Sequence, residues 1–244
     1  MSSSAEVSIR GLSKHFGPVV AVDDLDFDVP PGRVTGFLGP NGAGKTTTLR
    51  MLLGLVRPSA GQALIGGQPY RRLADPRRTV GAVLEAAGFH PGRRGRDQLR
   101  VSAYAAGLPA RRVDEVLDLV GLTEAAGRRV RGYSLGMRQR LALATAMLGD
   151  PEVLVLDEPA NGLDPAGMAW LRGLLVDLAE EGRTVVVSSH VLSEVAQTVD
   201  HVVIVHRGRL RFDGSLGELA SSAAELEAAF LRLTRDEPHA VPGR

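Results

Sequence analysis

Residues 39–46 read GPNGAGKT, and this short segment constrains the fold more than any other part of the chain. It follows an apolar, strand-like run at Val34–Leu38 and precedes a helix-like run, which is the setting that the pattern G-x-x-x-x-G-K-[ST] requires. Its glycines let backbone N–H groups surround a phosphate, and the start of the following helix adds a favourable dipole. The segment therefore predicts a phosphate-binding loop for a nucleoside triphosphate.

Two side chains of this phosphate loop (residues 39–46) have separate expected tasks. Lys45, one of only two lysines in the chain, is expected to reach the β- and γ-phosphates. The Thr46 hydroxyl is expected to ligate Mg²⁺. We expect the following residues to bind the nucleotide: Gly39, Pro40, Asn41, Gly42, Ala43, Gly44, Lys45, Thr46 and Thr47.

Apolar runs rich in β-branched residues alternate with helix-period runs along most of the chain. The run at 153–156 is apolar throughout, as are residues 185–187 of the strand-like run at 184–187, which is typical of strands covered by helices on both faces. The run at 19–29 instead alternates apolar and acidic residues, as a half-exposed antiparallel strand does. Residues 85–131 have helical patterns without a convincing strand. The predicted class is α/β, with a mostly parallel sheet. Further strands are expected at 7–9, 34–38, 79–84 and 202–205, and helices at 45–55, 111–120, 135–148 and 166–180.

Three acidic or basic side chains follow the two buried runs. Asp157 and Glu158 come directly after the run 153–156, and His190 follows the run 185–189. Because parallel strands end at the same edge of a sheet, these side chains are expected beside the phosphate loop. Asp157 is expected to hold Mg²⁺ through water, Glu158 to polarise the attacking water as general base, and His190 to point at the γ-phosphate.

These elements, in this order, resemble the ATP-binding subunit of an ATP-binding cassette (ABC) transporter over about residues 7–214. The signature segment (residues 133–139, YSLGMRQ) lies where the family has L-S-G-G-Q, with Leu135 and Met137 in place of a glycine and the glutamine. This form is similar to the variant of a bacterial drug- and antibiotic-export branch. The resemblance implies that Ser134 and Gly136 contact the γ-phosphate held by a second subunit.

The same resemblance assigns three further residues. Asp164, in the NGLD loop (residues 161–164), matches a family loop that contacts the opposite active site of a dimer. Phe16 lies where the family places an aromatic ring that stacks on adenine. Glu85 replaces the glutamine that coordinates Mg²⁺ and water in most members, and a carboxylate accepts hydrogen bonds but donates none.

The domain organisation expected from the resemblance is one ABC ATPase domain at 1–214, followed by a short helical extension and tail at 215–244. The core is expected to be that of a P-loop NTPase, with an antiparallel β subdomain on the N-terminal side and a helical subdomain inserted at about 86–136. The stretch 221–233 is amphipathic and is expected to pack on the core or to contribute to subunit contacts. Its apolar face consists of Leu226, Ala229, Phe230 and Leu233.

Composition limits the classes of function. The chain contains no cysteine, which excludes disulfides, thiolate catalysis and Cys-ligated zinc. A formal net charge of +1 argues against a surface for nucleic acid. No apolar run approaches the roughly 18 residues that cross a bilayer, and the first ten residues lack a secretory pattern. These features fit a cytoplasmic protein.

The function implied by the resemblance is ATP hydrolysis that drives export of a drug, an antibiotic or a peptide. ATP and Mg²⁺ are the expected cofactors. The expected partners are a separate integral membrane permease and a second copy of the chain or a homologous ATPase subunit, at the cytoplasmic face of a bacterial membrane.

Three alternatives have less support. A soluble ABC-type ATPase acting on nucleic acid or ribosomes usually has two cassettes or long insertions, which this chain lacks. A GTPase is suggested only by the short match D-x-x-G at 164–167, and the chain has no N-K-x-D motif to read guanine. A regulatory cassette without catalytic activity conflicts with the presence of both Glu158 and His190.

Overall fold

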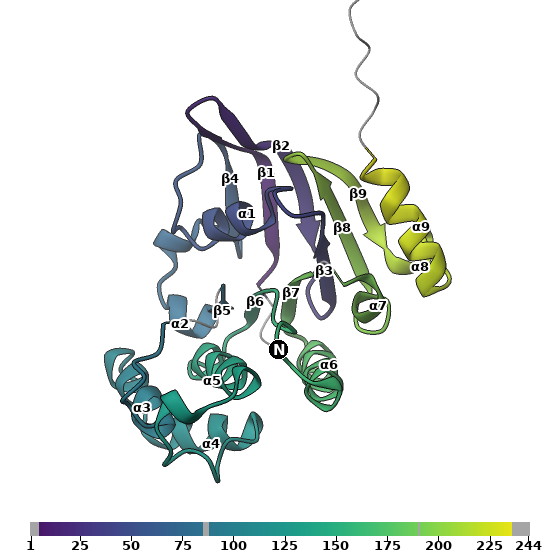
Figure 1. Ribbon diagram of the computed structural model, residues 1–244. Coiled ribbons are helices and arrows are strands. Elements are labelled where there is room, and N and C mark those ends of the chain that lie inside the picture. The colour runs from purple at the N-terminus through teal and green to yellow at the C-terminus, as the bar shows by residue number, and fades with distance from the viewer. Residues whose placement is uncertain (1–4, 85–87, 190, 236–244) are drawn as a thin grey trace, which may run out of the picture.

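The computed structural model describes residues 5–84, 88–189 and 191–235, with only the backbone described at 193 and 194. Two sheets organise these residues (Figure 1). A six-stranded sheet has the order β5-β6-β7-β3-β8-β9, in which β9 alone runs antiparallel to its neighbour. A three-stranded antiparallel sheet has the order β2-β1-β4. The strands are β1 (Val7–Phe16), β2 (Val19–Val29), β3 (Val34–Leu38), β4 (Ala60–Ile65), β5 (Val80–Val83), β6 (Val153–Asp157), β7 (Thr184–Ser189), β8 (His201–His206) and β9 (Arg209–Ser215).

Helices cover the larger sheet and extend beyond it (Figure 1). The helices α3, α4 and α5 gather beside β5, while α8 and α9 lie at the opposite end beside β9. Two short 3-10 turns occupy 70–72 and 130–132. The α-helices are α1 (Lys45–Leu52), α2 (Pro76–Thr79), α3 (Gly95–Ala105), α4 (Arg111–Leu119), α5 (Leu135–Met147), α6 (Pro165–Glu180), α7 (Leu192–Val195), α8 (Leu216–Leu219) and α9 (Ala223–Leu233).

Both faces of the parallel strands are buried, as the sequence predicts. In β6, Val153 and Val155 belong to an apolar cluster with α1 and the antiparallel sheet. The alternate residues Leu154 and Leu156 belong to the cluster formed with α5 and α6. Since successive side chains of a strand point to opposite faces, a strand between two such layers is apolar throughout. The predicted α/β class, with an antiparallel sheet and helices beside the parallel core, is therefore confirmed.

Three strands differ from the expected elements, while the C-terminal amphipathic helix agrees with one expected role. Strand β1 is longer than the expected 7–9, and the strands β4 and β9 were not predicted. Helix α9 packs its buried Leu226 and Ala229 against the core, with Phe230 and Leu233 partly buried beside them. Core packing, the first of the two roles expected for this amphipathic stretch, is thus observed.

Candidate functional site

The phosphate loop connects the end of β3 to the start of α1. Gly39 and Gly44 are required by close packing: a Cβ atom at Gly39 would overlap the Val205 carbonyl oxygen, and one at Gly44 would lie 2.5 Å from the Ala21 carbonyl oxygen. Gly44 also has φ +104°, a conformation that favours glycine. The Ala43 N–H donates to the Pro40 carbonyl at 3.1 Å, which turns the loop on itself. No described side chain caps α1, so its first N–H groups are available to an anion.

Lys45 is the first residue of α1, and its ammonium is buried inside the loop. Its Nζ donates to the Gly39 carbonyl at 2.6 Å and lies 4.0 Å from Glu158 Oε1. Burial lowers the pKa of Lys45 below its ordinary value, and the carboxylates of Glu158 and Asp157 oppose this shift. The side chain is therefore held by carbonyl groups that a phosphate could replace.

Thr46 and Ser188 both contact the Asp157 carboxylate at the end of β6. Thr46 Oγ1 donates to Asp157 Oδ2 at 2.7 Å, and Ser188 Oγ donates to Asp157 Oδ1. A hydroxyl and a carboxylate are hard oxygen donors of the kind that Mg²⁺ prefers together with substrate phosphates. The described residues hold no cluster of three or more His, Cys, Asp or Glu side chains able to form a metal cage. The donor set thus fits a metal ion that is shared with phosphate groups.

Glu158 follows Asp157 in a left-handed backbone conformation with φ +52°. For a residue other than glycine this conformation costs about 1–2 kcal/mol, and such strain is concentrated at functional sites. The Glu158 N–H donates to Ser188 Oγ at 3.0 Å, so the two strand ends β6 and β7 are tied together. The Glu158 side chain is 23% exposed and borders a cleft of about 720 Å³.

This cleft separates the carboxylates from the signature segment of the same chain. Thr46, Asp157 and Glu158 line one part of it, and Leu135 and Arg138 line another. The sequence reasoning did not single out Arg138 or Ser188. For Ser188, the available signal was a small polar residue at the end of a buried strand, which parallel pairing places opposite Asp157.

The signature segment and the NGLD loop each begin a helix. Ser134 is the N-cap of α5, where its Oγ accepts from the Met137 N–H at 3.1 Å. Asp164 is the N-cap of α6 and accepts from the Gly167 N–H at 2.7 Å. Gly136 lies beside Leu163, since a Cβ atom there would be 3.4 Å from Leu163 Cδ2.

The structure brings some of the expected site residues together and leaves others apart. Lys45, Thr46, Asp157 and Glu158 form one contacting group. Phe16 is 49% exposed at the end of β1, with Lys14 Nζ 4.9 Å from its ring centre. No described contact joins Phe16, Ser134, Gly136 or Asp164 to that group. Of the remaining loop positions, Asn41 and Gly42 are exposed, whereas Pro40 and Thr47 are half-buried. Glu85 and His190 lie outside the described residues.

One observation concerns whether a described helix could cross a membrane. Among the described helices, none has the length and apolar character needed to cross a bilayer.

Comparison with known sequences finds a matching family profile and related transport ATP-binding proteins. The ABC transporter family profile matches residues 22–161. The chain is 44% identical over 210 residues to the bacitracin transport ATP-binding protein BcrA of Bacillus licheniformis, covering 85% of this chain and 69% of that protein. It is 33% identical over 213 residues to the lantibiotic transport ATP-binding protein SrtF of Streptococcus pyogenes, covering 86% of this chain and 92% of that one.

Solved structures match along almost the whole chain. An ATP-binding subunit of an ABC transporter superposes with a TM-score of 0.83 at 26% identity, covering 94% of this chain and 99% of that one. A dimeric bacterial ABC transporter cassette superposes with a TM-score of 0.78 at 23% identity, covering 86% and 98%. At that identity the second match supports the fold alone.

Proposed function

Since the chain belongs to the ABC transporter family as an ATP-binding ATPase subunit, we propose that it powers an exporter as a dimer around two MgATP. The main support for this proposal is the contacting group formed by Lys45, Thr46, Asp157 and Glu158 near the strand ends. Lys45 Nζ lies 4.0 Å from Glu158 Oε1, and Thr46 Oγ1 contacts Asp157 at 2.7 Å. A candidate base (Glu158), a cation (Lys45) and two oxygen ligands (Thr46 and Asp157) thus lie together at the end of the phosphate loop.

The proposed chemistry is in-line attack of water on the γ-phosphate of ATP, giving ADP and phosphate. Glu158 accepts a proton from the attacking water, and Lys45 leaves the Gly39 carbonyl to bind the β- and γ-phosphates. Thr46 and Asp157 would hold Mg²⁺, which supplies neutralisation of phosphate charge when bound. The N–H groups at the start of α1 stabilise the same charge. We propose Glu85 and His190 as further metal-binding and catalytic residues, respectively.

A second copy would complete each site. We propose that its Ser134 and Gly136 approach the γ-phosphate through the start of α5, where the helix dipole favours an anion. Asp164 would contact the opposite site across the dimer. The exposed ring of Phe16 would stack on adenine, a role that its 49% exposure supports. The loop residues 39–47 would surround the triphosphate.

The names of the relatives support the proposed cargo. The names of two similar proteins state bacitracin and lantibiotic transport, which supports a drug, an antibiotic or a peptide as cargo here. The chain would act on a separate membrane permease at the cytoplasmic face of a bacterial membrane. We propose that residues 1–214 form one ATPase domain with a helical insertion at about 86–136, and that 215–244 form an extension. A ribosomal or nucleic-acid role has no supporting observation.

Two variants test the ATPase proposal. Glu158→Gln removes the base while ATP still binds, so a dimer that elutes early in size-exclusion chromatography is expected with ATP and not with ADP. Glu180→Gln, at an exposed position of α6, is the matched control and is expected to hydrolyse ATP normally. Lys45→Ala is expected to lower ATPase activity at least about a hundredfold. A monomeric Glu158→Gln variant in ATP would refute the shared site, and near-normal activity of Lys45→Ala would refute the phosphate-loop assignment.

The cargo proposal needs a cellular test. The chain is expressed together with any membrane permease found to be encoded next to its gene, in a bacterium sensitive to bacitracin and to a lantibiotic. Resistance to either compound that disappears with Glu158→Gln supports export. Unchanged sensitivity to both, with ATPase activity intact, would refute this cargo class.

A further inference from the structure

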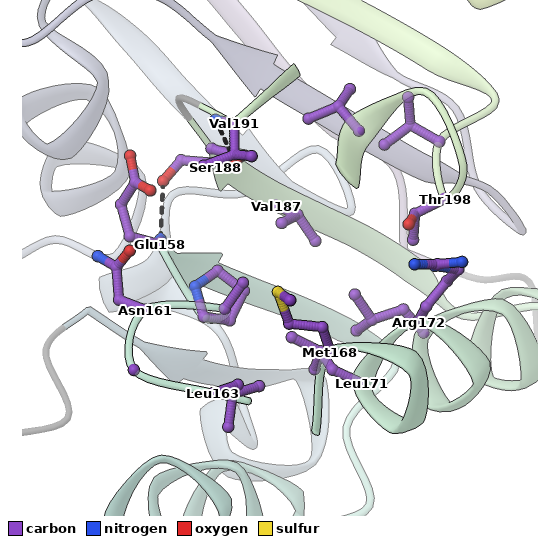
Figure 2. Close-up of a pocket in the computed structure, with 17 residues that line it drawn as sticks. Glu158, Asn161, Leu163, Met168, Leu171, Arg172, Val187, Ser188, Val191 and Thr198 are labelled. Carbon is purple, nitrogen blue, oxygen red and sulfur yellow. Dashed lines mark hydrogen bonds between the residues drawn. The ribbon is translucent and has the colours of Figure 1, made fainter. Parts of the chain in front are cut away.

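A second hollow lies behind Glu158, away from the phosphate loop. It has a volume of about 220 Å³ and is bounded by α6, the end of β7 and the segment 191–199 (Figure 2). None of residues 39–46 contributes to its wall. The hollow is therefore separate from the phosphate loop, and it shares Glu158 and Asn161 with the cleft of about 720 Å³.

The wall of this hollow is mainly apolar. Leu171, Leu175 and Val195 are only 2–4% exposed to solvent, yet they border empty space. Met168 and Val187 point toward its centre (Figure 2). Protein interiors rarely contain voids larger than a water molecule, and an apolar cavity of about 150 Å³ is large enough to bind benzene. The hollow thus has the size and chemistry to hold a small apolar group.

One end of the hollow carries a positive charge. Figure 2 shows the Arg172 guanidinium beside Thr198 at one end, with Glu158 and Asn161 at the other. Arg172 is partly buried, and no hydrogen bond or ion pair with it occurs among the described residues. A guanidinium against an apolar wall favours a carboxylate, which it binds through two parallel hydrogen bonds. The Glu158 carboxylate at the far end disfavours a second anionic group there.

We propose that this hollow binds a small amphiphilic monocarboxylate, with the carboxylate at Arg172 and Thr198 and an apolar body between α6 and β7. A straight chain of about eight carbons or a pair of fused rings fits the size class set by the cavity. The wall also includes Pro159 and residues 161–163 of the NGLD loop. An occupant therefore packs against the segment that directly follows Glu158. This inference is independent of the proposed cargo and of the dimer.

The test is calorimetric titration of the nucleotide-free chain with octanoate, and with octanol as the uncharged probe of the same length. Saturable binding of one octanoate per chain is expected, with octanol at least about tenfold weaker. Arg172→Gln is expected to weaken octanoate binding at least tenfold, and Arg172→Lys is expected to weaken it less, because lysine keeps the charge but lacks the fork that makes two parallel hydrogen bonds. Arg232→Gln, at an exposed arginine of α9 outside the wall, is the matched control and is expected to bind normally.

A second variant tests the cavity itself. Met168→Trp places a larger side chain in the hollow and is expected to abolish binding of both probes, with the thermal unfolding transition preserved. The proposal is overturned if octanoate shows no saturable binding. It is equally overturned if Arg172→Gln and Met168→Trp both bind octanoate as the unchanged chain does. Because no nucleotide is present, either outcome is distinguishable from a failure of the ATPase proposal.

Discussion

Leu135, the first residue of α5, covers Gly162 of the NGLD loop so closely that a Cβ atom at Gly162 would overlap the Leu135 side chain. Gly162 also has φ +79°, which disfavours other residues. The signature segment and the NGLD loop are thus packed together within one chain. A leucine where the family signature has a glycine is accommodated here by a glycine in the facing loop.

This contact predicts a specific pattern of double substitution. Gly162→Ala should destabilise the chain by about 1–3 kcal/mol through overpacking and backbone strain, and should lower ATPase activity. Leu135→Ala removes the atoms that are overlapped, so the double variant should recover part of the stability, with a coupling energy of about 1 kcal/mol. Urea unfolding of the four chains measures the cycle. Gly173→Ala, a helical glycine with open space around it, is the control and should not destabilise. Additive effects would contradict the contact.

Ser188 links the Asp157 carboxylate to the backbone N–H of Glu158, and its removal should affect turnover more than binding. Its hydroxyl donates to Asp157 and accepts from the Glu158 N–H. Loss of a charge-assisted hydrogen bond of about 1.5–3 kcal/mol should lower kcat of Ser188→Ala roughly ten- to a hundredfold. KM for ATP should stay within about twofold, since the phosphate loop is untouched. Steady-state kinetics provide the measurement, and Ser188→Thr should restore activity because it keeps the hydroxyl. An unchanged kcat would refute this role.

Arg112 of α4 donates hydrogen bonds to carbonyl groups at the C-terminal end of α5. Its Nε donates to the Leu148 carbonyl at 3.0 Å, and its second terminal nitrogen donates to the Met147 carbonyl at 2.9 Å. The bond to Leu148 satisfies a carbonyl group at the helix end, whereas the Met147 carbonyl also accepts from the Asp150 N–H at 3.1 Å. Arg112→Ala should therefore lower the free energy of unfolding by about 2 kcal/mol.

The neighbouring Arg111 provides the control for this prediction. Its side chain is 80% exposed, and within the described part of the chain its one ion pair is with Glu115, at 3.8 Å. Arg111→Ala should change stability by less than about 0.5 kcal/mol. Arg112→Lys should fall between the two, because an ammonium lacks the fork that reaches both carbonyls. Equal losses for Arg111→Ala and Arg112→Ala in urea titrations would rule out this role of Arg112.

The sequence predicted the buried centre of the fold better than its edges. Residues 153–156 of β6 and 185–187 of β7 are all apolar because helices and a second sheet cover both faces, and this pattern is visible in the residues alone. Strand β4 was missed because Ala60, Gly61 and Gln62 are exposed at its start. Strand β9 was missed because exposed charged residues alternate with half-buried ones along an edge. Edge strands lack the burial on both faces that makes a strand recognisable.

In the candidate site, residues in local motifs were predicted, whereas contacts between distant segments were not. Lys45, Thr46, Asp157 and Glu158 were predicted because each lies in a local motif or at a strand end. The contact between Leu135 and Gly162 joins residues far apart in the sequence, and nothing in either segment indicates it. Likewise, the two bonds of Ser188 depend on the register between β6 and β7, which a single sequence does not specify.

A histidine at the start of β8 should make stability depend on pH. His201 Nε2 lies 3.2 Å from Asp213 Oδ1, and the His201 side chain is 12% exposed. Burial lowers the pKa of His201 below 6.5, Asp213 opposes the shift, Arg33 adds to it and Glu218 opposes it. Burial also raises the pKa of Asp213 above 3.8, an effect that its pairing with His201 reduces. The cost of removing both groups from water therefore exceeds the benefit of their pairing.

The direction of the effect follows from proton counting. Because the pKa of His201 is lower in the folded chain, the unfolded chain binds more protons just below pH 6.5. The contribution of His201 to the free energy of unfolding is therefore fully present above that pH. It decreases as the pH falls toward the folded pKa, by at most about 1.4 kcal/mol per pH unit. Asp213 acts in the opposite direction at lower pH, since protonation is favoured in the folded chain. His201→Gln should flatten the dependence of the unfolding midpoint between about pH 7.5 and pH 5.5. His15→Gln, at an exposed position of β1, should leave it unchanged, and equal slopes for His201→Gln and the unchanged chain would contradict the assignment.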